Sequence, residues 1–189
     1  MIMCMYKNIC ITNRKLVKGD FLEQVRKVAG LGADALILRE KDLEEQEYEV
    51  LARKVLAVCS ETSVVCILHS FPETARKLNH PYIHLPMSRF LELGGQEKRW
   101  FRQIGVSTHT VEEAVKAEKL GADYITASHI FPTACKPGAE PRGLSYLEEV
   151  CRSVRIPVYA LGGIHPDKAE LCIQAGAAGI CMMSEYMKL

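Results

Sequence analysis

Hydrophobic and polar residues follow one another in a pattern that recurs four times along this chain. In each copy an amphipathic stretch ends at Gly or Asn, and a short apolar run begins a few residues later. The copies align on Gly32, Asn79, Gly121 and Gly176, at spacings of 47, 42 and 55 residues. Because Gly and Asn tolerate the left-handed backbone that ends a helix, each copy predicts a helix followed by a strand.

A repeat of about 45 residues has room for two strand–helix units, since one βαβ unit takes about 30 residues or more. The repeat itself supplies four strands, and apolar runs between the copies supply four more. All eight runs are short and continuously apolar, which is typical of strands buried on both faces. The pattern therefore predicts a (β/α)8 TIM barrel in a single domain, residues 1–189. The predicted strands are residues 9–12, 35–38, 64–68, 82–85, 103–106, 124–127, 158–161 and 179–182.

Amphipathic stretches between these runs predict the outer helices, at residues 20–31, 43–60, 110–120 and 166–175. Thr110 and Glu113 have the spacing of a capping box at the start of the third stretch. Only five residues follow Ser184, so we expect a minimal barrel with the last helix truncated. Apolar surface left uncovered there predicts a homodimer, unless residues 1–6 cover it.

Composition limits the classes of partner. The 189 residues are 48% hydrophobic and 25% charged, with a net charge of +1, which does not favour nucleic acid or an anionic membrane. No apolar run approaches the roughly 18 residues of a membrane span, and the first residues lack the order of a signal peptide. None of the eight cysteines forms a CxxC pair. We expect reduced thiols in a cytoplasmic protein without a structural zinc site.

Barrels of this type carry their chemistry at the carboxyl ends of the strands, which directs attention to the residues that follow each run. Gly162 and Gly163 follow the seventh predicted strand, and Met183 and Ser184 end the eighth. Loops at these two positions commonly bind phosphate through backbone N–H groups. A tight turn without a ligand is the alternative for the glycine pair.

Four histidines, His69, His109, His129 and His165, also follow predicted strands. The pKa of imidazole lies near neutrality, so this pattern favours acid–base chemistry. Metal binding is the alternative, although the rim supplies few carboxylates and no HxH or HxxxH pair.

Basic residues complete the predicted rim. Arg39 and Lys41 follow the second strand, and the long segment 128–143 carries Thr133 and Lys136. Arg and Lys at such positions favour an anionic substrate. An exposed ion pair, for example between Arg39 and Asp42, is the alternative.

With these motifs the chain resembles the thiamine phosphate synthase and thiazole tautomerase (TenI) superfamily. The matching phrases are ILREKD (37–42), GVSTHTVEEAVKAEKLGADYI (105–125), HIFPTACKPG (129–138), GLSYL (143–147), IPVYALGGIHPDK (156–168) and AGAAGICMMS (175–184).

The synthase branch implies a transferase that joins a pyrimidine methyl pyrophosphate to a thiazole phosphate and uses magnesium. Its metal carboxylates are expected after the third and fourth strands. Those positions carry His69-Ser70 and Pro86-Met87-Ser88 here, and neither stretch supplies a carboxylate. Magnesium prefers oxygen ligands, so we expect no metal cofactor.

The tautomerase branch implies an isomerase that moves a proton on a thiazole carboxylate phosphate without metal. Ser107-Thr108-His109 and the Thr-x-Cys-Lys phrase at 133–136 resemble that branch. We therefore expect thiazole tautomerase activity, with His109 and His129 as acid–base groups. The alternatives are a synthase with a degraded magnesium site and a non-catalytic ligand-binding regulator. The resemblance assigns the phosphate to Gly162, Gly163, Met183 and Ser184, and the rest of the substrate to Arg39, Lys41, His69, Thr133 and Lys136.

Overall fold

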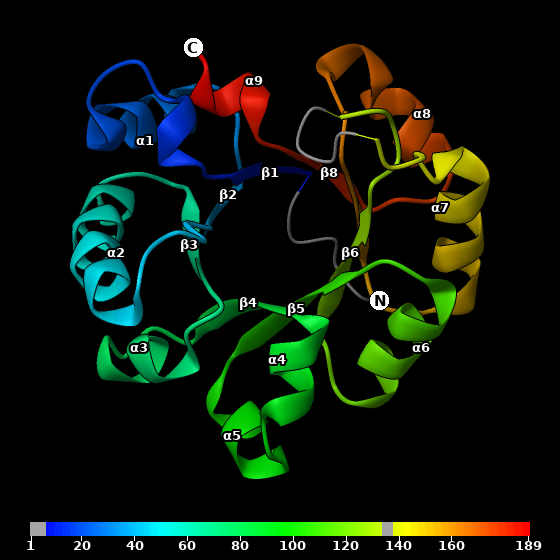
Figure 1. The fold of residues 1–189 in the computed structure, drawn as a ribbon, viewed down its shortest axis with the longest axis horizontal. Coiled ribbons are helices and arrows are strands. Elements are labelled where there is room, and N and C mark those ends of the chain that lie inside the picture. The colour runs from blue at the N-terminus through cyan, green and yellow to red at the C-terminus, as the bar shows by residue number, and fades with distance from the viewer. Residues whose placement is uncertain (1–6, 134–137) are drawn as a thin grey trace.

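The computed structural model describes residues 7–133 and 138–189, and its strands form the closed parallel barrel that the repeat predicts. Each strand pairs with its successor, and β8 pairs with β1 (Figure 1). Three predicted strands have the observed bounds, and the others differ by one or two residues. The strands are β1 (Asn8–Ile11), β2 (Ala35–Leu38), β3 (Val65–His69), β4 (Tyr82–Pro86), β5 (Gln103–Thr108), β6 (Tyr124–Ser128), β7 (Val158–Leu161) and β8 (Gly179–Met182).

Helices surround this ring on its outer side (Figure 1). The predicted stretch 166–175 begins with a 3-10 turn, and residues 88–101 divide into two short helices at Leu93 and Gly94. The helices are α1 (Phe21–Gly30), α2 (Glu45–Ser60), α3 (Pro72–Lys77), α4 (Met87–Glu92), α5 (Gly95–Trp100), α6 (Val111–Lys119), α7 (Gly143–Ser153), α8 (Ala169–Gln174) and α9 (Ser184–Met187), with 3-10 turns η1 (Arg14–Leu16) and η2 (Pro166–Lys168).

The strands are buried on both faces, which explains their continuous apolar character. Alternate residues such as Ile9, Ile37 and Ile67 fill the barrel interior with Tyr124 and Tyr159. The residues between them pack outward in a second, larger cluster that includes the buried faces of the helices. Each strand therefore joins the interior of the barrel to its outer helices.

The four residues that align the repeat share one backbone conformation. Gly32, Asn79, Gly121 and Gly176 have φ of +81°, +51°, +91° and +98°, and each lies two residues beyond the end of its helix. Three of the turns carry the hydrogen bonds of a Schellman motif, for example from the N–H of Ala122 to the carbonyl of Ala117, 3.0 Å long. These turns lead into the amino ends of the even strands, opposite the rim that carries the chemistry.

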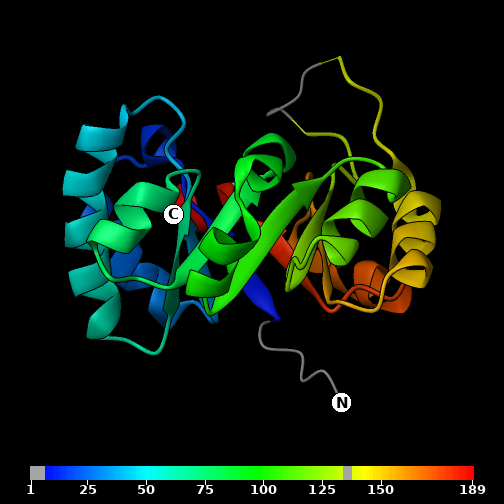
Figure 2. The ribbon, with the colours of Figure 1, turned by 90° about the horizontal axis from the view of Figure 1, so that it is seen from below.

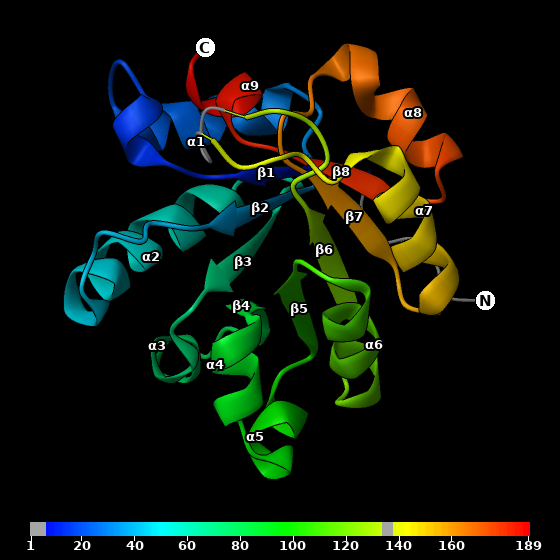
Figure 3. The same ribbon diagram turned by 45° about the vertical axis from the view of Figure 1, so that its right-hand side comes forward.

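The truncated last helix is confirmed, because α9 is a single turn. It lies beside α1 (Figure 3), where Gln24 Nε2 donates a 2.6 Å hydrogen bond to the carbonyl of Tyr186. Tyr186 and Met187 are buried, so this turn covers part of the surface that a longer helix would occupy. The homodimer stays a prediction, and residues 1–6 lie outside the described residues. In the described part of the chain, no helix has the length and apolar character needed to cross a membrane.

We expect Gly121→Ala to lower the free energy of unfolding by about 1–2 kcal/mol, because a side chain is strained at positive φ. Gly95→Ala is the matched control: a Cβ meets nothing within 4 Å at either glycine, but only Gly121 has a positive φ. Chemical denaturation of both variants measures the difference. Equal stability of the two variants would contradict this account of the repeat.

Candidate active site

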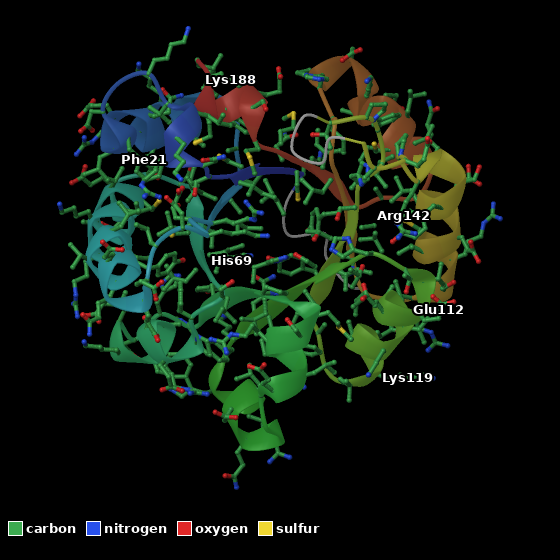
Figure 4. All side chains as sticks on the ribbon, in the orientation of Figure 1. Phe21, His69, Glu112, Lys119, Arg142 and Lys188 are labelled. Atoms are coloured by element: carbon green, nitrogen blue, oxygen red, sulfur yellow. The ribbon has the colours of Figure 1, made fainter. Side chains whose placement is uncertain are left out.

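A cavity of about 540 Å³ opens at the carboxyl ends of the strands, and all eight strands contribute to it directly or through the residues that follow them. Figure 4 shows His69 inside the ring of strands, whereas Glu112 and Lys119 lie on the outer helix α6. The cavity gathers residues that are far apart in sequence. Of the residues assigned to the site from sequence, it is lined by Arg39, Lys41, His69, His109, His129, Thr133, Gly162, Gly163, Met183 and Ser184.

Close backbone contacts require glycine at both positions after β7. Gly162 and Gly163 have φ of +102° and +63°. A Cβ on Gly162 would lie 2.3 Å from Cβ of His129, and one on Gly163 would lie 2.3 Å from the carbonyl oxygen of Pro132. The loops after β6 and β7 therefore touch backbone to backbone. The same lack of side chains leaves main chain at the cavity wall, where an anion can approach it.

A hydrogen-bonded pair connects the loops after β7 and β8. Nδ1 of His165 lies 2.7 Å from Oε1 of Glu185, and both residues line the cavity. Gly163 and Ser184, which precede them in sequence, line the cavity beside this pair. The two predicted phosphate loops thus form one wall.

Arg39 and Lys41 reach the cavity because the residues after β2 alternate in direction. Glu40 faces away from the cavity and is only 3% exposed. It accepts hydrogen bonds from the Thr12 hydroxyl (2.7 Å) and from the backbone N–H and Nη1 of Arg14 (3.0 and 3.1 Å). The Arg39 N–H in turn donates to Thr12 Oγ1 at 2.9 Å. A buried carboxylate therefore fixes the segment that carries the two cations.

The same network continues to the surface. Arg14 donates to both carboxylate oxygens of Asp42 at 2.7 and 2.9 Å, and Lys15 Nζ lies 2.9 Å from the same group. The hydrogen bond from Arg14, and to a smaller extent the one from Lys15, hold the pKa of the Asp42 carboxyl well below its usual range. The alternative in which Asp42 pairs with Arg39 is therefore replaced by pairing with Arg14, and Arg39 lines the cavity.

His69 lines the cavity at the end of β3, and His84 on β4 lies beside it with its side chain buried. Their rings are nearly parallel, with centroids 5.8 Å apart and an angle of 14°. Nδ1 of His69 lies 2.7 Å from Oγ of Ser70. Burial, and then the neighbouring His84, Arg39 and Lys41, hold the pKa of His69 well below its usual value. Burial, and then Arg39, also lower the pKa of His84, to about 3, so both histidines are neutral at physiological pH.

His109 and His129 stand on the opposite wall. Nδ1 of His109 lies 3.0 Å from Oγ of Ser128, and its backbone N–H donates to Glu113 at 2.6 Å. His129 is 6% exposed. A second cavity of about 450 Å³ lies beyond these histidines, toward Arg142 at the start of α7. Figure 2 shows residues 138–142, directly before α7, extending above the ring of strands.

Several cavity residues were missed in the sequence interpretation, among them Ser107, Pro86 and Lys188. Ser107 belongs to the Ser-x-His phrase and Pro86 stands where a metal carboxylate is expected, but neither is assigned to the site from sequence. Lys188 lies beyond the last predicted strand and has no motif around it. Side chains alternate in direction along a strand, and this alternation predicts that Ser107 points inward from β5. It is the one signal from which Ser107 could have been assigned to the cavity. Lys136, assigned to the substrate from sequence, lies outside the described residues.

The donor groups at the ends of β3 and β4 do not fit a magnesium site. His69, Ser70 and Pro86 stand there, and His69 and Ser70 bond to each other. Among the described cavity residues, Glu185 is the single carboxylate, and it is bonded to His165 on another wall. In residues 7–133 and 138–189, no cluster of three His, Cys, Asp or Glu side chains is placed to hold a metal ion.

Comparison with known proteins identifies the family. A family model described as thiamine monophosphate synthase matches residues 8–186. The chain belongs to this family. A relative from Aquifex aeolicus, "Putative thiamine-phosphate synthase 2", is 38% identical over 178 residues, which cover 94% of this chain and 96% of the relative. The thiamine-phosphate synthase of Clostridium tetani is 31% identical over 183 residues, covering 94% and 86%.

The fold agrees with that membership. The solved structure of thiamine phosphate pyrophosphorylase from Pyrococcus furiosus has a TM-score of 0.83 and 28% identity, and the match covers 100% of this chain and 90% of that one. The (β/α)8 prediction and the superfamily resemblance are both confirmed.

The isomerase expectation is wrong. Relatives at 31–38% identity are named thiamine-phosphate synthase, which is a transferase, and not tautomerase. The proton-shuttle roles given to His109 and His129 depended on that expectation.

We expect Glu40→Gln to lower the free energy of unfolding by about 1–3 kcal/mol, because it removes the charge that holds Arg14. It should also weaken binding of an anionic probe such as inorganic pyrophosphate, because the backbone of Arg39 is fixed through the same network. Glu92→Gln is the control, since Glu92 pairs with Arg89 on an exposed helix surface and should change stability by a few tenths of a kcal/mol. Thermal denaturation and calorimetric titration with pyrophosphate measure both effects. An unchanged pyrophosphate affinity in a folded Glu40→Gln protein would show that the Glu40 network does not influence binding at the cavity.

Proposed function

We propose that this protein is a transferase that joins a pyrimidine methyl pyrophosphate to a thiazole phosphate and releases pyrophosphate. Membership of the thiamine monophosphate synthase family supports the reaction class. The geometry adds an argument of its own, which lies in the number of anion-binding regions within one cavity.

Two walls of the cavity are suited to anions, and β1 lies between them. One wall carries the guanidinium of Arg39 and the ammonium of Lys41 after β2. The other, which we call the glycine wall, consists of Gly162, Gly163 and Ser184 after β7 and β8. A reaction of two phosphorylated molecules accounts for both regions, one for the pyrophosphate and one for the phosphate. This pairing is the observation that carries the proposal.

Each wall receives one substrate in this proposal. Arg39 and Lys41 hold the pyrophosphate, and the glycine wall holds the thiazole phosphate. The bond between the pyrimidine methylene carbon and the pyrophosphate oxygen breaks, and its electron pair leaves with the pyrophosphate. The lone pair of the thiazole nitrogen forms the new carbon–nitrogen bond. The two cations stabilise the charge that develops on the leaving group, which is the usual role of Arg and Lys beside a phosphate.

No step is assigned to a metal, because the residues after β3 and β4 lack the carboxylates that magnesium prefers. The same observation supports the second candidate function, a regulator that binds the two phosphates without turnover. His109, His129 and Thr133 line the same cavity in either case, and we assign them to contacts with the bound rings.

Incubation of the full chain with both substrates decides between the two candidates. We expect stoichiometric formation of thiamine phosphate and pyrophosphate, with and without a chelator of divalent cations. Lys41→Met and Arg39→Met should each lower kcat/KM by about 10- to 100-fold, the effect of losing a charge-assisted hydrogen bond. Lys54→Met removes the same charge from the exposed side of α2 and is the control.

Tight binding of both phosphates by calorimetry without product would exclude the transferase and leave the regulator. Product that forms only in the presence of magnesium would contradict the assignment of the pyrophosphate to the two side-chain cations.

We expect Ser184→Asp to weaken binding of the thiazole phosphate by 10-fold or more, because it adds a negative charge to the glycine wall. Ser184→Ala is the control and should bind the same ligand within a few-fold. Ser184 is the better position for this test, because any side chain at Gly163 would strain its backbone and meet Pro132. If Ser184→Asp binds the thiazole phosphate with the same affinity as Ser184→Ala, the thiazole phosphate does not bind at this wall.

A further inference from the structure

A chain of three polar side chains runs from the cavity into the sealed interior of the barrel. Oγ of Ser107, at the cavity surface, lies 2.8 Å from Nε2 of His84. Nδ1 of His84 lies 3.0 Å from the hydroxyl oxygen of Tyr124. His84 and Tyr124 are 2% and 1% exposed. Both ring nitrogens of His84 are therefore engaged, and Ser107 is the end of the chain that meets the cavity.

The fold reserves space for this contact. Gly105 precedes Ser107 on the same face of β5, and a Cβ there would lie 2.0 Å from Cζ of Tyr124 and 2.5 Å from Nδ1 of His84. Only a residue without a side chain allows the Tyr124 hydroxyl to reach the imidazole. The contact thus depends on three neighbouring strands, β4, β5 and β6.

His84 carries a single ring proton. Burial, and then the charge of Arg39, lower its pKa to about 3, so the ring is neutral at physiological pH. A neutral imidazole has one donor nitrogen and one acceptor nitrogen. The chain can consequently point in one of two directions, toward the cavity or away from it.

The chemistry of the two ends favours the direction toward the cavity. A phenol hydroxyl is a better donor and a poorer acceptor than a serine hydroxyl, because the ring withdraws its lone pairs. Tyr124 then donates to Nδ1 of His84, and Nε2–H of His84 donates to Oγ of Ser107. The proton of Ser107 is left for a partner in the cavity. Each bond in such a chain polarises the next, which strengthens the final donor.

We propose that His84 and Tyr124 are positioning residues that turn the Ser107 hydroxyl into a hydrogen-bond donor for an acceptor atom of the substrate. That acceptor is a phosphate oxygen or an unprotonated nitrogen of a heteroaromatic ring. The direction of the chain is a property of the protein alone, and only the identity of the ligand rests on the proposed transferase function.

The first experiment measures the direction without any ligand. Nitrogen-15 spectra of the histidine side chains in the full chain distinguish protonated from unprotonated ring nitrogens. We expect His84 to be protonated at Nε2 and unprotonated at Nδ1 between pH 5 and pH 9. In Tyr124→Phe the Nδ1 atom loses its donor, and the Nδ1–H tautomer should become populated. An Nδ1–H tautomer in the unmodified protein would overturn the proposal.

The second experiment measures what the chain does for binding and turnover, with pyrimidine methyl pyrophosphate and thiazole phosphate as probes. Tyr124→Phe should lower kcat/KM or the affinity for one probe by roughly 3- to 10-fold, the worth of one hydrogen bond. In a Ser107→Ala background the same substitution should change nothing further, because the group it orients is absent. Equal losses in both backgrounds would indicate a merely structural role and would overturn the proposal.

Tyr159→Phe is the matched control. Its ring packs edge-on against Tyr124 with centroids 5.4 Å apart and is equally buried, so the substitution removes a tyrosine hydroxyl from the same core. It should leave the His84 tautomer and the kinetics unchanged, and an equal effect of Tyr159→Phe would count against the proposal. If neither probe binds the unmodified protein, the transferase proposal fails while the tautomer measurement still decides the direction of the chain.

Discussion

The closed ladder of eight parallel strands is the constraint on which the rest of this structure depends. Because all strands run the same way and β8 returns to β1, their carboxyl ends form one continuous rim. Residues from eight distant parts of the chain then face a common cavity, which no open sheet of this length would enclose. The same closure hides both faces of every strand, so polar groups inside the barrel need partners within it.

Those partners are arranged in two layers with different purposes. At the rim, buried Glu40 is surrounded by donors and fixes the backbone that carries Arg39 and Lys41. Below the rim, His84 bonds at both nitrogens while it remains neutral. Among the described residues, the polar side chains buried below the rim, such as His84 and Tyr124, are neutral, and the charged groups lie at the rim or outside it. This division is consistent with the high cost of an unpaired charge in a low-dielectric interior.

The sequence predicts the fold better than the chemistry, and the reasons are physical. Strands buried on both faces are continuously apolar, so β2, β7 and β8 can be located to the residue. The left-handed turns at Gly32 and Asn79 require particular residue types, which makes the repeat visible. Which histidine faces which partner depends on contacts between strands, and no local pattern encodes them. The isomerase expectation failed for a related reason: a Ser-x-His phrase fixes the direction of side chains and not the reaction they serve.

The pairing of β1 with β8 also bears on how the chain folds. The hydrogen bond between Gln24 and Tyr186 joins residues that are 162 positions apart, and the β1–β8 ladder beside it has a similar separation. Closing so long a loop costs chain entropy, which opposes these contacts, whereas a helix and its adjacent strand can form locally. We therefore expect an open array of strand–helix units to precede the ring. Until the ring closes, β1 and β8 expose unpaired edges, and this intermediate is the species most prone to association.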